Sequence, residues 1–89
     1  MKGQPVKAVI RIDPPASRWI RQQNPPGLKQ TVPLENDRIE LHFDMEGRRE
    51  LMWWTLQWGR YAEVISPPDF RDEVRREVEA ALLKYQDSS

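Results

Sequence analysis

Few residues of this 89-residue chain have the chemistry of a catalytic or metal-binding site. The chain holds one histidine, His42, and no cysteine, which excludes disulfide bonds and thiolate zinc sites. A metal ion at His42 would need Glu40, Asp44 or Glu63 as co-ligands, and their spacing matches no diagnostic metal motif. The serines and threonines have no partnered base, and the four glycines form no phosphate-binding loop. We therefore expect no catalytic residue, no metal and no cofactor.

Three basic side chains are the best candidates for binding a ligand. Residues 6–12 alternate with period two, which predicts a half-buried strand with Lys7 and Arg11 on its outward face. Residues 38–45 alternate in the same way and place His42 on the corresponding face. Because the hydrophobic core does not require these side chains, they could meet an anionic ligand or a nucleic-acid backbone.

The same cations could instead be neutralised within the sheet. The carboxylates of Glu40, Asp44 and Glu63 are expected on the same face and could form cross-strand ion pairs with them. The chain has 14 basic and 14 acidic residues, without the basic excess typical of nucleic-acid binders. The central strands also offer no outward aromatic residue on which a base could stack. Both interpretations of this face stay open.

A tryptophan-rich segment, residues 50–68, is the centre of the expected fold. It begins with a helix that is apolar around most of its circumference, which predicts burial on more than one side. Trp54 and Trp58 share one helical stripe and are expected in the core. Trp53 lies away from that stripe and is a candidate partner contact if exposed, whereas packing on the first helix is equally compatible with its position. Gly59 stands where a helix ends in the left-handed conformation.

The order of elements predicts an α+β fold. Strands are expected over residues 6–12, 29–34, 38–45 and 62–65, with helices at about 14–23, 48–58 and 67–85. The first six elements follow the β-α-β-β-α-β order of ferredoxin-like folds, in which the first and third strands are central in an antiparallel sheet and both crossover helices cover one face. The last helix is an addition that could lie at an edge or pair with another chain.

The length and composition indicate one small domain. Apolar residues make up 38% of the chain and charged residues 31%, so part of its stability could come from a partner or from the rest of a longer protein. We expect a linker remnant at residues 1–5, the domain at 6–85 and a frayed tail at 86–89. No apolar run suggests a membrane span or a signal peptide, so a cytoplasmic location is expected.

The chain resembles the C-terminal extension, or WCX domain, of bacterial WYL-domain transcriptional regulators. The resemblance covers roughly residues 6–85 and rests on AVIRID, PPASRWIRQ, a hairpin ending in RIELHFDM, and ELMWWTLQWGRYAEVISPPDFRDEV. The passage from Trp58 and Gly59 through AEVISPP is its most specific part. Trp53 departs from the family pattern, because a polar residue is expected there. Family members place a DNA-binding helix-turn-helix domain first, an Sm-like WYL domain second and this ferredoxin-like extension last.

The resemblance implies a non-enzymatic regulatory domain that contributes to dimerisation and to ligand sensing. Its implied partners are the WYL and helix-turn-helix domains of the parent chain, a second copy in a homodimer, and an effector such as single-stranded nucleic acid or a nucleotide. No membrane partner is implied. Lys7 and Arg11 are the basic residues that match best. The alternative is a stand-alone nucleic-acid- or small-ligand-binding module that uses the open face of the sheet. A small enzyme or metal carrier of this fold is disfavoured by the missing cysteines and the lone histidine.

Overall fold

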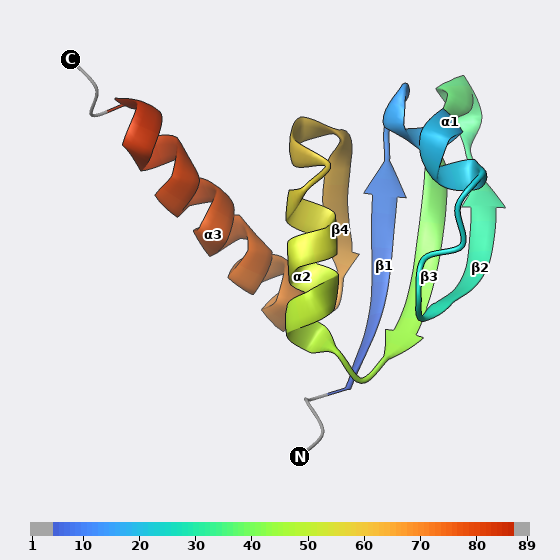
Figure 1. Cartoon of the computed structure of the whole chain (residues 1–89), viewed down its shortest axis with the longest axis horizontal. Coiled ribbons are helices and arrows are strands. Elements are labelled where there is room, and N and C mark those ends of the chain that lie inside the picture. The colour runs from blue at the N-terminus through green and yellow to red at the C-terminus, as the bar shows by residue number, and fades with distance from the viewer. Residues whose placement is uncertain (1–4, 87–89) are drawn as a thin grey trace.

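The computed structural model describes residues 5–86 and shows the expected order of elements (Figure 1). The helices and strands are β1 Val6–Ile12, α1 Ala16–Arg21, β2 Leu28–Pro33, β3 Ile39–Met45, α2 Arg48–Leu56, β4 Ala62–Ser66 and α3 Pro68–Gln86. Two short 3-10 turns are inserted, η1 Glu35–Asp37 and η2 Gly59–Tyr61. Apart from Pro5 and Gln86, the expected linker remnant and frayed tail lie outside the described residues. Within those residues, no helix combines the length and the apolar character needed to span a membrane.

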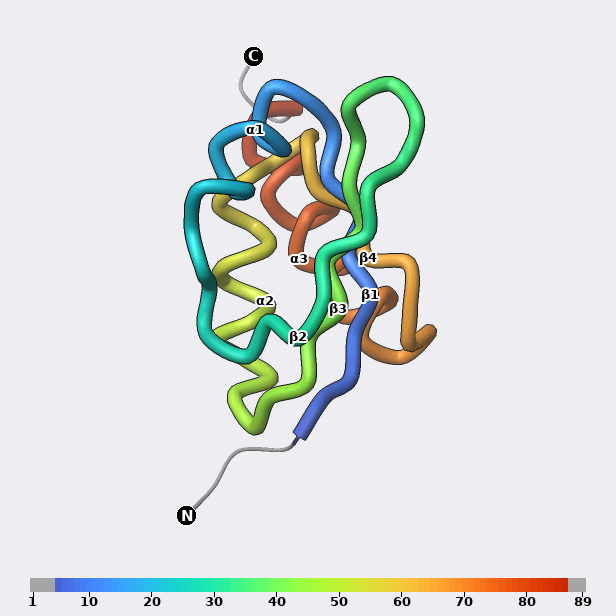
Figure 2. Tube along the Cα trace, turned by 90° about the vertical axis from the view of Figure 1, so that its right-hand side faces the viewer, coloured from blue at the N-terminus to red at the C-terminus, as the bar shows by residue number. Residues whose placement is uncertain are grey.

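The four strands form one antiparallel sheet in the order β2-β3-β1-β4. This is the ferredoxin-like order predicted from the sequence, with β1 and β3 in the centre and β2 at an edge, where Pro33 needs no strand partner for its missing N–H. Figure 2 shows α1 and α2 together on one side of the sheet. The other side of β1 and β3 is the open face, and the sequence-predicted cations lie on it.

The core lies between the sheet and the two crossover helices. Every second residue of β1 and β3 points into it, as the period-two alternation predicts, and α1, α2, β4 and α3 each add apolar side chains. Those with less than 2% exposure include Ile10, Ile12, Ile20, Ile39, Leu41, Leu51 and Phe70. Burying a side chain of this size contributes about 1.5–3 kcal/mol to the free energy of unfolding. The buried Ser17 hydroxyl is satisfied because it donates to the Asp37 carbonyl (2.7 Å).

The prediction that α2 is buried on more than one side is wrong. Only Leu51 and Thr55 of this helix are fully buried, and 61% of Trp53 is exposed. Trp19 of α1 is 54% exposed, whereas Ala16, Ser17 and Ile20 of the same helix are buried. The reason is that α1 and α2 form a single layer on one side of the sheet, and within residues 5–86 no helix or strand lies over the outer side of that layer (Figure 2). Their outer apolar side chains therefore stay on the surface.

The first half of α3 is fastened to the rest of the fold, whereas the second half projects from it (Figure 1). Arg48 of α2 forms an ion pair with Glu73 and lies over the ring of Phe70, 5.4 Å from its centroid. Arg71 donates to the Val64 carbonyl at 2.5 Å, which ties the first turn of α3 to β4. These contacts are confined to the first turns, and they set the direction in which the helix leaves the sheet.

Candidate ligand-binding face

Strand register places the predicted ligand-binding residues on one open face. In the β1–β3 pair, Lys7 lies opposite Asp44, Val9 opposite His42, and Arg11 opposite Glu40. Residues directly opposite each other in an antiparallel pair point to the same face. Lys7, Arg11 and His42 therefore share one surface with the acidic residues that the sequence offered as alternative partners.

Arg11 is neutralised by its neighbours in the sheet. Its guanidinium donates to Glu40 at 3.2 Å, and its side chain is 33% exposed. On its other side Arg11 faces Glu63 of β4, whose carboxylate accepts a hydrogen bond from Arg71 at 3.0 Å. The cross-strand pairing that the sequence left open is thus formed at Arg11. A ligand would reach this guanidinium only by competing with Glu40.

His42 shares the same carboxylate with Arg11. Its Nε2 lies 3.7 Å from the second oxygen of Glu40, and 38% of the side chain is exposed. Among the residues that the structure describes, Nε2 has no hydrogen-bond partner and is itself shielded from solvent. The imidazole therefore lies against the Arg11–Glu40 pair, with its Nε2 turned away from solvent.

Lys7 and His42 line a shallow hollow of about 400 Å³ on the open face, together with Lys29 of β2. Asp44 and Ser66 also line it, and Arg11 does not. Sequence reasoning missed Lys29. The register of β2 shifts between Leu28 and Gln30, so Lys29 has no directly opposite residue on β3. A β-bulge of this kind breaks strict alternation, and only the weak apolar pattern of residues 28–33 could have hinted at it.

The chemistry of this hollow is that of anion binding. Lys7, Lys29 and His42 line the hollow with a single carboxylate, that of Asp44, so a phosphate or carboxylate group would meet more ammonium than carboxylate charge there. Between residues 5 and 86, no cluster of three His, Asp or Glu side chains could hold a metal ion. Within the described residues, the side chains of the hollow could meet an anion, and no partnered nucleophile or base lines it.

The perturbed acids lie in structural ion pairs elsewhere. A hydrogen bond from Arg18 lowers the pKa of Asp37, one from Arg48 lowers the pKa of Asp69, and one from Arg75 lowers the pKa of Asp72. All three pairs join or brace helices and turns, and none of these carboxylates lines the hollow. Their pKa shifts therefore report on stability, not on a reactive site.

The predicted partner contact Trp53 does not belong to the open face. It projects from α2, on the other side of the sheet, and its 61% exposure makes it available to another protein surface. The remaining tryptophans form a chain of ring contacts: the ring centroids of Trp19 and Trp58 are 6.4 Å apart, and those of Trp58 and Trp54 are 6.0 Å apart. Trp54 and Trp58, expected in the core, are half-buried at its margin.

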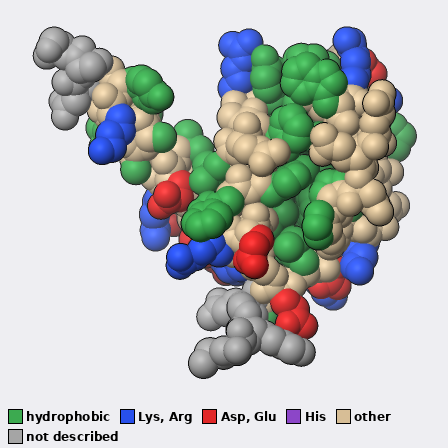
Figure 3. Space-filling view, in the orientation of Figure 1, with side chains coloured by type: hydrophobic (Ala, Val, Ile, Leu, Met, Phe, Trp, Pro, Cys, Tyr) green, Lys and Arg blue, Asp and Glu red, His purple; other side chains and the backbone are tan. Residues whose placement is uncertain are grey.

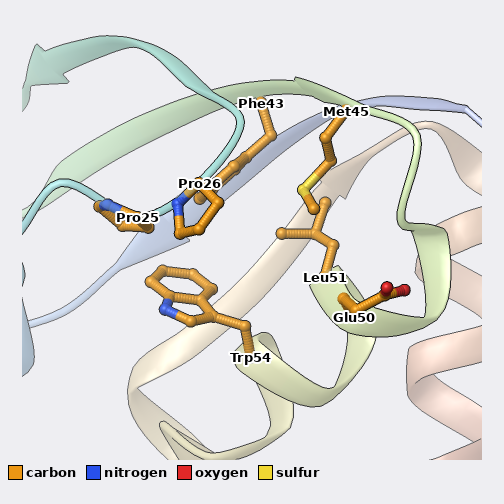
Figure 4. Close-up of a pocket in the computed structure, with 7 residues that line it drawn as sticks. All are labelled: Pro25, Pro26, Phe43, Met45, Glu50, Leu51 and Trp54. Atoms are coloured by element: carbon orange, nitrogen blue, oxygen red, sulfur yellow. The ribbon is translucent and has the colours of Figure 1, made fainter.

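An apolar pocket of about 310 Å³ lies on the helix-covered side (Figure 4). It is lined by Pro25, Pro26, Phe43, Met45, Glu50, Leu51 and Trp54. Figure 4 shows the two prolines facing the Trp54 indole across the pocket, with Leu51 and Met45 at its other end. Gly27, with φ of +85°, lets the proline loop approach this closely, since a Cβ there would lie 2.7 Å from the Met45 Cβ.

Comparison with known proteins identifies the family and the fold. A family model described as the WCX domain matches residues 4–82. No curated protein matches the chain. Among solved structures, proteasome accessory factor B/C of Arthrobacter aurescens is similar, with a TM-score of 0.75 and 20% sequence identity. The match covers 94% of this chain and 13% of that protein. At this identity the likeness supports the fold, and the chain spans only a small part of its structural relative.

Proposed function

Because this chain belongs to the WCX domain family, we propose that it is the regulatory domain of a WYL-type transcription regulator and takes part in sensing an effector. Its partners in that regulator are a WYL domain and a DNA-binding helix-turn-helix domain, and its role is not catalytic. We place such a regulator in the bacterial cytoplasm. The family match to nearly the whole chain supports this proposal, and the hollow on the open face suggests where an effector would bind.

The hollow carries the sensing part of the proposal. Lys7, Lys29 and His42 come from three different strands and line one depression, although the core needs none of them. We propose that Lys7, Arg11 and His42 bind the effector, with Lys29 beside them. Arg11 should contribute less than Lys7, because its guanidinium already bonds to Glu40. An effector with successive phosphates, such as single-stranded nucleic acid or a nucleotide, fits cations spread along neighbouring strands.

The exposed tryptophan side is the proposed contact with the rest of the regulator. Trp53 of α2 and Trp19 of α1 both expose more than half of their surface. Large exposed aromatic side chains are typical of the central part of protein interfaces. We place the WYL domain of the parent chain on this side, so that the effector face on the opposite side of the sheet stays accessible. We also propose that the regulator is a homodimer.

The test is oligonucleotide binding followed by fluorescence anisotropy. A labelled short single-stranded oligonucleotide is titrated with the chain and with the variant Lys7→Ala/Lys29→Ala at several salt concentrations. The slope of log K against log salt concentration is negative, and each lost phosphate contact should make it shallower by about 0.7. The slope for the double variant should therefore be shallower by about 1.4. His42→Ala should weaken binding with a smaller change in slope.

The matched control is Arg21→Ala/Arg49→Ala, which removes the same charge from exposed positions on α1 and α2. Its affinity should stay within about twofold of the parent, since these residues lie away from the open face. Equal losses in the two double variants would mean that net charge alone drives binding, and would refute a site at the hollow. In the full-length regulator, Lys7→Ala/Lys29→Ala should blunt effector-dependent DNA binding while the fold is retained.

A second candidate function is a stand-alone module that binds nucleic acid or a small ligand on the same open face. The hollow favours it equally, because Lys7, Lys29 and His42 are all supplied by this chain. The two functions differ in what they require of other domains. Oligonucleotide binding by the 89-residue chain at the affinity of the full regulator would favour the stand-alone module. Binding that appears only when the WYL domain is present would favour the regulatory domain.

A further inference from the structure

Along α3 an apolar stripe runs from the core outward, and its outer part is largely exposed within residues 5–86. Val74, Val78, Ala81 and Tyr85 recur at spacings of four, three and four residues, which places them along one side of the helix. Val74 is 8% exposed because it packs on the core, whereas Val78 is 52% exposed. Figure 3 shows hydrophobic side chains continuing along the helix where it leaves the body of the molecule. The stripe is therefore continuous with the core but reaches beyond it.

The stripe faces a groove between α3 and the body. This groove has a volume of about 580 Å³ and is lined on the body side by Thr55, Leu56, Gly59, Arg60 and Ala62, and on the helix side by Val74, Glu77, Val78 and Ala81. It widens because α3 diverges from α2 after its first turns (Figures 1 and 3). A groove with an apolar wall and a divergent opening suits an amphipathic helix that enters along the stripe.

We propose that the occupant of this groove is α3 of a second copy of the chain, packed antiparallel to the first. This inference rests on the dimeric regulator proposed above and names its interface. In heptad terms Val78 and Tyr85 take position a, and Val74 and Ala81 take position d. An antiparallel register that sets Val78 opposite Ala81 of the second copy overlaps the helices from Val74 to Tyr85, about 18 Å. The small Ala81 allows the helices to approach closely near the two-fold axis.

Charge complementarity supports this register. Glu77 and Lys84 each precede an a-position residue by one place, so both lie at position g beside the stripe. In the register that pairs Val78 with Ala81, Glu77 of each copy lies beside Lys84 of the other, and the two-fold axis repeats the contact. Among residues 5–86, neither Glu77 nor Lys84 takes part in an ion pair, although Arg75, Arg76, Asp72 and Glu79 of the same helix do.

The shape of the molecule favours the antiparallel direction. The sheet and the other helices all lie at the N-terminal end of α3 (Figure 1). A parallel pair would bring both bodies to the same end, where they would collide or separate the stripes. An antiparallel pair sets them at opposite ends, and the C-terminal turn of each helix then reaches the groove beside Leu56 and Ala62 of the other copy.

The experiment is sedimentation equilibrium of the 89-residue chain at low salt, from micromolar to several hundred micromolar protein. The parent should show a reversible monomer–dimer equilibrium. Glu77→Lys and Lys84→Glu each convert two attractive contacts into two repulsive ones, and each should raise the Kd about tenfold. The double reversal Glu77→Lys/Lys84→Glu restores both pairs with opposite polarity and should return the Kd to within about threefold of the parent.

The control Arg76→Glu changes the net charge as Lys84→Glu does, but its side chain lies on the outer surface of α3 beside Asp72. It should leave the Kd within about twofold of the parent. Any of three results would overturn the α3 interface. The parent could be a monomer at every concentration, the Kd could be unchanged by both single charge reversals, or the double reversal could have a Kd as high as the single reversals. None of these results would touch the oligonucleotide response assigned to Lys7 and Lys29, so the two proposals fail separately.

Discussion

Phe70 should be the residue on which the docking of α3 depends most. Its side chain is fully buried, and the Arg48 guanidinium lies over its ring. Replacing a buried phenylalanine by alanine removes its transfer free energy and leaves a cavity, at a cost of about 3–5 kcal/mol. Loss of the cation–π contact adds about 0.5–1 kcal/mol. Since a domain of this size has about 5–13 kcal/mol of stability, Phe70→Ala should remove about a quarter of it or more.

Urea unfolding followed by tryptophan fluorescence measures this loss. At micromolar protein, Phe70→Ala should lower the unfolding midpoint by roughly 2–4 M. The control Val78→Ala lies on the same helix at 52% exposure and should change the free energy by less than about 0.5 kcal/mol. If Phe70→Ala leaves no folded protein, Phe70→Leu should still unfold cooperatively, at a cost below about 1.5 kcal/mol. Equal midpoints for Phe70→Ala and Val78→Ala would show that α3 does not dock through its first turns.

Three further outcomes follow from the same contacts. Trp58→Ala should lower the free energy of unfolding by about 2 kcal/mol, which is less than the loss at a fully buried tryptophan, because Trp58 is half-buried against Trp54. A urea midpoint equal to that of the parent would show that Trp58 does not pack on the core. Gly59→Ala should cost about 1–2 kcal/mol from backbone strain alone, since φ is +58° while the space for a Cβ is open; its thermal midpoint should match that of Gly59→Ser. Hydrogen bonds from Arg18 and Arg48 lower the folded-state pKa values of Asp37 and Asp69 below 3.8, so the stability that these carboxylates contribute is present above about pH 4 and is lost as the pH falls through the lowered values. Urea unfolding midpoints measured from neutral pH downward should show this decline. The variant Arg18→Ala should make the decline shallower.

The sequence alone determined the sheet and its two faces. The period-two alternation in residues 6–12 and 38–45 is a local property, since each strand side chain points opposite to its neighbours whatever the rest of the chain does. It therefore predicted that Ile10 and Leu41 are buried and that Lys7, Arg11 and His42 point outward. Gly59 was likewise predictable, because a left-handed residue after a helix is a local requirement.

The tertiary structure decided which of these outward residues act together. Whether Arg11 meets Glu40 or a ligand depends on the register between strands that are far apart in the sequence, and that register pairs the two. The hollow includes Lys29 because a bulge shifts β2, and the weak apolar pattern of that strand at most hints at a bulge. The residue opposite each cation on the neighbouring strand determines whether that cation is already paired. The sequence therefore predicted which cations face outward, but not which of them are free to bind a ligand.

The exposure of the helices was also determined by the tertiary structure. An apolar circumference predicts burial only if neighbours exist on every side, and α2 has the sheet on one side and no cover over Trp53. The stripe of α3 was visible in the sequence, but its outer half is exposed because the ion pair of Arg48 with Glu73 and the burial of Phe70 fix only the first turns of the helix. Residue types determine what a surface can bind, whereas the directions of the packed elements determine which surfaces are left to bind it.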